Sequence, residues 1–175
     1  MEQSININQA TLEILLHELH DACSDAIVIP SNSRLMPSGT LRCNVLKKAG
    51  AKVQIECNRI INKISTIPVG GAVITSAGEL PSKYIIHANN SSRDKKSLMK
   101  ATWNSLKAAN KKKFENIVFC ALSKDMQGFT MKACAKIMIL TIKKYLAEQN
   151  RSLKKVCICL ENEKDYKDFE KILNE

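Results

Sequence analysis

The chain has 175 residues, a length typical of one domain with a single substantial core. Lysine and arginine outnumber aspartate and glutamate by 27 to 17, so the net charge is +10. No apolar run approaches the roughly 20 residues of a membrane-spanning helix, and the first residues have neither the basic nor the apolar region of a secretory signal. We therefore expect an intracellular protein, in the cytoplasm or nucleus, with no membrane partner.

The seven cysteines form an odd set without a CxxC pair or histidines at zinc-ligand spacing. We expect most of them to be buried, reduced thiols, and we expect neither a metal site nor a cofactor. His17 and His20, near Glu18 and Asp21, have a spacing that suits two metal ligands on a helix. A solvated polar face explains these side chains better.

The predicted elements alternate between helix and strand along the chain. Between residues 12 and 23, apolar side chains recur at helical spacing, so residues 1–24 are expected to hold a strand and an amphipathic helix. Residues 25–29, DAIVI, are a continuous apolar run that predicts a strand covered on both faces. Similar runs follow at 71–77, 83–88, 116–122 and 155–160, and helical patterns lie at 53–64, 98–110, 131–148 and 165–173. This order predicts an α/β sandwich with a mostly parallel central sheet.

Ligands of such folds bind beyond the carboxyl ends of the strands, where loops and helix amino termini present backbone N–H groups. Two segments occupy that place. Residues 30–40 follow the strand at 25–29, and residues 123–130 follow the strand at 116–122. The first segment resembles a phosphate-binding loop in position, but its only glycine is Gly39.

From Asp25 onward the motifs resemble those of the macrodomains, modules that bind ADP-ribose and in some branches hydrolyse ADP-ribosyl bonds. DAIVIPSN is similar to the family's DAIVNAAN, GELPSKYIIHA to a segment ending in LPxKYVIH, and FCALSKDMQGFT to FPAISTGIYGYP. The resemblance implies a three-layer α/β/α sandwich with a mixed, mostly parallel sheet, in a single domain over residues 1–175. The ligand-binding residues that it implies are Ser31, Asn32, Gly39, Thr40, Ser123, Lys124, Gly128 and Phe129.

The first loop departs from the family pattern where hydrolysis would be carried out. The family's run of four glycines falls on residues 37–40, of which only Gly39 is a glycine. The acid that helps to activate water in hydrolytic branches falls on Arg42, which cannot act as a general base because its guanidinium stays protonated. Asn32 is retained as the best single candidate for a ligand contact, although an asparagine that forms a turn is an equally good interpretation.

The positions that bind adenine and diphosphate also differ. An aromatic residue that often covers the adenine falls on Glu161, and the acid that reads the adenine amino group has no clear counterpart, with Gln9 as the nearest neutral substitute. In the second loop Asp125 replaces a glycine and would repel a diphosphate, an effect that Lys124 could offset.

We therefore expect a divergent macrodomain-like module that recognises ADP-ribose or ADP-ribosylated protein, without hydrolase activity. One alternative is a catalytically inactive macrodomain-like fold that binds RNA or another polyanion through a basic surface. The other is an ADP-ribosyl hydrolase with relocated catalytic groups. The candidate residues for the basic surface are Lys47, Lys48, Lys111, Lys112, Lys113, Lys124, Lys154 and Lys155.

Overall fold

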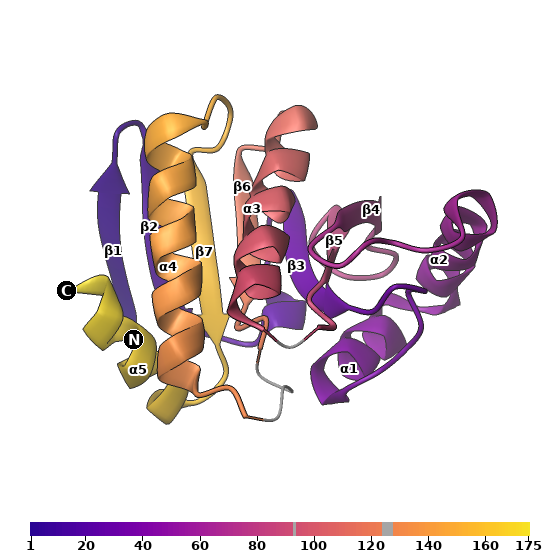
Figure 1. Ribbon diagram of the computed structural model, residues 1–175, viewed down its shortest axis with the longest axis horizontal. Helices are drawn as coiled ribbons and strands as arrows, with labels where there is room; N and C mark the ends of the chain where they lie inside the picture. Colours follow the sequence, from indigo (N-terminus) through magenta and orange to yellow (C-terminus); the bar gives the residue numbers. More distant parts are fainter. Residues whose placement is uncertain (93, 124–127) are drawn as a thin grey trace.

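Figure 1 shows the computed structural model of the chain, which describes residues 1–92, 94–123 and 128–175. The described residues form one seven-stranded sheet of order β1-β2-β7-β6-β3-β5-β4. Its strands are β1 (Glu2–Ile7), β2 (Ala10–Leu16), β3 (Ala26–Ser31), β4 (Ala72–Ser76), β5 (Tyr84–Asn89), β6 (Asn116–Cys120) and β7 (Lys155–Leu160). The helices are η1 (Leu19–Asp21), α1 (Thr40–Ala49), α2 (Ala51–Ile64), α3 (Lys95–Lys111), α4 (Met131–Glu148) and α5 (Glu163–Leu173).

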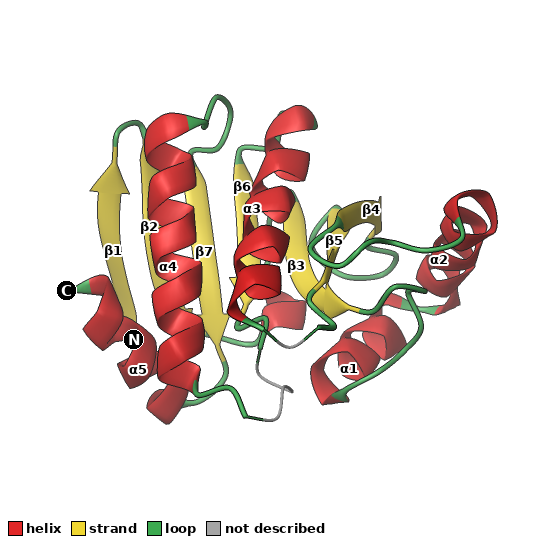
Figure 2. Cartoon of the chain, viewed as in Figure 1, coloured by secondary structure: helices red, strands yellow, loops and turns green. Residues whose placement is uncertain are grey.

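The sheet is mixed and mostly parallel. Strands β2, β7, β6, β3 and β5 run in parallel, while β1 is antiparallel to β2 and β4 is antiparallel to β5. Helices α3 and α4 lie side by side across one face (Figures 1 and 2), and α5 packs against α4 and β2. Helices α1 and α2 pack against β3 and β4. The predicted α/β/α sandwich is thus confirmed.

The helix predicted between residues 12 and 23 is wrong. Strands β1 and β2 form a hairpin around Asn8, whose φ of 54° suits an asparagine in a tight turn, and only the short η1 follows. Leu12 and Ile14 are fully buried on one side of β2, and Glu13 points to the other side, where Lys155 of β7 pairs with its carboxylate. Pairing with β1 and β7 uses the backbone of β2 on both edges, so tertiary contacts override the local helical pattern.

The carboxyl ends of the parallel strands meet at one edge of the sheet, because parallel strands share a direction. The segments after β2, β3, β5, β6 and β7 therefore lie at this edge, which we call the cleft edge. The residues of β3 between Ala26 and Ile29 are at most 1% exposed, as expected of a strand covered on both faces. In the described part of the chain, no helix combines the length and apolar character that crossing a membrane requires.

Candidate functional site

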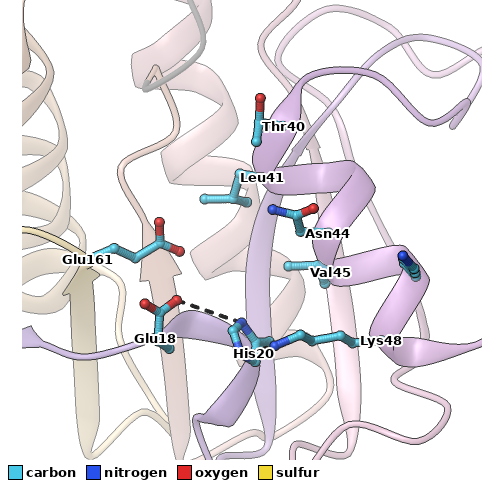
Figure 3. Close-up of a pocket in the computed structure, with 9 residues that line it drawn as sticks. Glu18, His20, Thr40, Leu41, Asn44, Val45, Lys48 and Glu161 are labelled. Atoms are coloured by element: carbon cyan, nitrogen blue, oxygen red, sulfur yellow. Dashed lines mark hydrogen bonds and ion pairs between the residues drawn. The ribbon is translucent and has the colours of Figure 1, made fainter.

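A pocket of about 540 Å³ opens at the cleft edge (Figure 3). One wall is the side of α1 that carries Thr40, Asn44 and Lys48. The facing wall consists of Glu18, which follows β2, and Glu161, which follows β7. Three segments that are distant in sequence are thus brought together by the order of the strands.

Asn32 shapes the first loop with its side-chain amide. The amide nitrogen donates to the carbonyl of Met36 at 2.9 Å and to the hydroxyl of Ser38 at 3.0 Å. The amide oxygen accepts from the backbone N–H groups of Arg34 and Met36. Both ends of the amide therefore stabilise the turn, in agreement with the turn-forming interpretation of Asn32.

Arg42 lies beneath the same loop and is only 1% exposed. Its Nε donates to the carbonyl of Met36 at 3.0 Å, Nη1 to that of Pro30 at 3.3 Å and Nη2 to that of Leu35 at 3.0 Å. These bonds hold both ends of the loop to the first turn of α1. The position where the resemblance implies a catalytic acid thus carries a buried cation that donates only.

His87 of β5 completes the contacts of Arg42. Nη1 of Arg42 lies 2.9 Å from Nδ1 of His87, and because a guanidinium has no lone pair, Nδ1 is the acceptor. The ring proton is therefore on Nε2, which lies 2.8 Å from the hydroxyl of Thr75. Burial, and then the charge of Arg42, hold the pKa of His87 well below its usual value of 6.5, so its imidazole is neutral.

Three other expected ligand residues of the first loop take different places. Thr40 lines the pocket, and Gly39 begins α1 with a φ of 71°, a conformation that glycine adopts without strain. Gly39 offers no side-chain cap, so the amino terminus of α1 lacks a side-chain hydrogen bond from its N-cap residue. Ser31 is buried, and its hydroxyl donates to the backbone carbonyl of Asn32.

The second loop is described at its two ends. Ser123 is 2% exposed, and its hydroxyl has no hydrogen-bond partner among the described residues. Gly128 has a φ of 80°, and a Cβ atom added there would have no described atom within 4 Å. Phe129 packs partly against the core. Lys124 and Asp125 lie outside the described residues.

Glu18 is the residue that the sequence analysis missed. Gln9, expected as a substitute for the adenine-reading acid, instead lies in the β1–β2 turn and lines a different hollow with Asn150 and Lys154. Glu18 stands just beyond the end of β2 and faces the pocket with Glu161 (Figure 3). Recognition of β2 as a strand would have revealed it, because the first acid after a strand lies at the cleft edge.

His20 lines the same pocket. Its ring nitrogens lie 3.8 Å from a carboxylate oxygen of Glu18 and 3.5 Å from one of Asp21, and the ammonium of Lys48 contacts Nε2. Within residues 1–92, 94–123 and 128–175, no group of three or more His, Cys, Asp or Glu side chains could hold a metal ion.

The lysines expected to form one basic surface are divided between two edges of the sheet. Lys47 and Lys48 line the pocket, whereas Lys155 begins β7 at the opposite edge and Lys154 directly precedes it. Lys154 pairs with Glu115 at 2.9 Å, and Lys155 pairs with Glu13. Lys111, Lys112 and Lys113 end α3 or follow it directly.

A family model described as Macro domain matches residues 28–138 of the chain. The chain belongs to the macro domain family. A macro domain-containing protein of Listeria monocytogenes is 32% identical over 86% of this chain and 89% of the relative. An O-acetyl-ADP-ribose deacetylase of Escherichia fergusonii is 27% identical over 89% of this chain and 91% of the relative. Among solved macro domains, a mutant Oceanobacillus iheyensis macrodomain with ADPR is 26% identical to this chain, with a TM-score of 0.92. The match covers 99% of this chain and 97% of the neighbour's chain.

Proposed function

We propose that this macro domain binds ADP-ribose, free or attached to a protein, at the cleft edge, and that it does not hydrolyse the ligand by an acid-assisted route. Membership of the family and the likeness to a macrodomain solved with ADPR support the ligand. The single observation that supports the absence of hydrolysis is the burial of Arg42 at the position of the expected acid.

The pocket suits the adenine end of the ligand. The amino group of adenine is a hydrogen-bond donor, and the carboxylate of Glu18 can accept from it. Glu161, on the same wall as Glu18, gives a second carboxylate but no ring on which adenine could stack. We therefore expect hydrogen bonding rather than stacking to select the base.

The diphosphate would lie between the two loops. The amino terminus of α1 favours an anion through its backbone dipole, and no acidic residue occupies the first turn of this helix. Open space beside Gly128 lets a phosphate approach the backbone of the second loop.

The first test is a calorimetric titration with ADP-ribose and with inosine diphosphate ribose, whose base carries a carbonyl in place of the amino group. We expect the adenine ligand to bind at least tenfold more tightly, because a carboxylate repels a carbonyl oxygen. The conservative Glu18→Gln variant replaces a charged acceptor by a neutral amide, so it should lose roughly tenfold in affinity for ADP-ribose. Its amide nitrogen can donate to the carbonyl of the inosine ligand, so most of the discrimination between the two ligands should also be lost. Equal affinities of the native protein for the two ligands would contradict the role given to Glu18.

A separate test addresses catalysis. The protein should release neither ADP-ribose from a modified protein nor acetate from O-acetyl-ADP-ribose, and the Escherichia fergusonii deacetylase is the positive control for acetate release. Release of either product, if saturating ADP-ribose inhibits it, would show a relocated catalytic arrangement. It would reject the proposed absence of hydrolysis, while the calorimetric result on binding would stand.

A further inference from the structure

Helices α3 and α4, which lie side by side over one face of the sheet (Figure 1), are rich in lysine. The 17 residues of α3 include five lysines and no acid, and the 18 residues of α4 include four lysines and, at the last position, Glu148. Lys100 and Lys144 form no ion pair within the described part of the chain. A surface of this kind attracts anionic partners.

An apolar hollow of about 310 Å³ lies between the two helices, within this basic surface. We call it the α3–α4 groove, and its lining residues are Met99, Lys100, Trp103, Asn104, Thr141 and Lys144. Met99 in the groove is 47% exposed, and Leu140, which is on α4 but is not a lining residue, is 54% exposed. Exposed apolar side chains inside a polar rim are typical of a protein interaction site.

The floor of the groove is fixed in position by an aromatic contact. The rings of Trp103 and Tyr145 meet edge to face, with centroids 4.9 Å apart and an interplanar angle of 81°. Tyr145 is buried, so its ring holds the indole of Trp103 against the core. An indole that is already held in one position loses less conformational entropy when a partner binds.

We propose that the α3–α4 groove is a docking site for an acidic protein segment that inserts one bulky apolar side chain. The volume of the hollow suits a single large side chain, while Lys100 and Lys144 beside it can pair with carboxylates on either side of the inserted residue. A second copy of this chain does not fit, because it would present like charge. This site is distinct from the pocket at the cleft edge and adds a partner to the proposed function.

A nucleic acid suits the groove less well than a peptide does. Proteins that bind single strands stack successive bases on several exposed aromatic rings. The two helices contain only Trp103 and Tyr145 as aromatic residues, and Tyr145 is buried. Neither helix therefore provides a row of rings for bases.

The test measures fluorescence anisotropy with three labelled probes at 50 and 200 mM salt. One probe is a 12-residue peptide of glutamate and serine with a central tryptophan, the second has serine in place of that tryptophan, and the third is a 12-nucleotide single-stranded oligo(dT). The test protein is Lys100→Glu/Lys144→Glu, and the matched control is Lys52→Glu/Lys63→Glu on α2, which changes the net charge equally. All four lysines are exposed, so both variants should keep the native circular dichroism spectrum.

We expect the tryptophan peptide to bind at least tenfold more tightly than the serine peptide at both salt concentrations. Its affinity should fall at least tenfold in the groove variant and less than threefold in the control. Equal binding of the two peptides, or equal losses in the two variants, would overturn the proposal, because charge alone would then explain the binding. Tighter binding of the oligonucleotide, lost in the groove variant, would overturn it in favour of a nucleic-acid surface.

Discussion

Arg42 illustrates how a single side chain can define the chemistry of a loop. Its three bonds to backbone carbonyls place a fixed positive charge under the segment that would face the ligand. The identity of this residue could be read from the sequence, because the resemblance runs through the loop without a gap. Its partner His87 could not, since 45 residues separate the two and only the pairing of β3 with β5 brings them together.

The stability of the protein should depend on pH through His87. The pKa of this histidine is held well below 6.5 in the folded state by burial and by Arg42, so below pH 6.5 the unfolded chain binds a proton that the folded chain does not. The free energy of unfolding should therefore fall as the pH drops, with a slope that approaches about 1.4 kcal/mol per pH unit. Urea denaturation at several values between about pH 5 and 7 measures this slope.

The control for this prediction is His87→Gln, which has no titrating ring. The variant is expected to be less stable at every pH, but it should lack the part of the slope that His87 causes. Parallel pH profiles for the two proteins would contradict the prediction, because other groups would then account for the whole dependence.

Gly128 tests the diphosphate position directly. A valine there would enter the open space and would also strain a backbone with a φ of 80°, so Gly128→Val should weaken ADP-ribose binding at least tenfold. Gly128→Asn separates the two effects, because asparagine tolerates a positive φ better than valine does. Calorimetry should show a loss in both variants, and native affinity in either one would remove this glycine from the site.

At the scale of elements, the helices differ in how they begin. Helices α3, α4 and α5 have the side-chain caps Asp94, Thr130 and Asn162, each of which accepts from a backbone N–H in the first turn. Helices α1 and α2 follow Gly39 and Gly50, which cannot cap in this way. Of these two helices, α1 lies beside the pocket, where a bound anion could take the place of the missing cap.

Loss of the α4 cap should lower stability without changing the fold. Thr130→Ala removes the hydrogen bond of 3.1 Å that the N–H of Ala133 donates to the Thr130 hydroxyl. We expect a decrease of about 1 kcal/mol in the free energy of unfolding, measured by urea denaturation, and little change in Thr130→Ser, which keeps the hydroxyl. A decrease of the same size in both variants would mean that the methyl group, not the cap, is responsible.

The accuracy of the element predictions follows the length of each pattern. Helix α4 agrees with the predicted residues 131–148, because its apolar period extends over five turns and a capping threonine precedes it. The prediction for the amino-terminal segment failed because its leucines fit both a helix and a strand over a short distance. What decides between the two is pairing with β7, more than 100 residues later in the sequence, which local periodicity cannot show.

At the scale of the whole molecule, the two proposed sites use different parts of the sandwich. The pocket with Glu18 and Glu161 lies at the cleft edge, whereas the α3–α4 groove lies between two helices. The ribbons of these helices cover one face of the sheet (Figures 1 and 2). The groove could not be predicted from the sequence, because α3 and α4 must first pack side by side to form it. The lysines alone suggested only a basic surface of unknown location.

Binding at the two sites should therefore be independent. We expect saturating ADP-ribose to change the affinity for the acidic tryptophan peptide less than twofold, as measured by anisotropy. A change of more than fivefold would show that the sites are coupled, and linkage would then require the peptide to change the affinity for ADP-ribose by the same factor.

The buried guanidinium also limits how this protein could evolve. Replacing Arg42 alone by an acid would not place a general base beside water, because the new carboxylate would face the carbonyl oxygens of Pro30, Leu35 and Met36. The loop would have to be rebuilt at the same time. An acid-assisted route at this position therefore requires changes in the loop backbone as well as in the side chain.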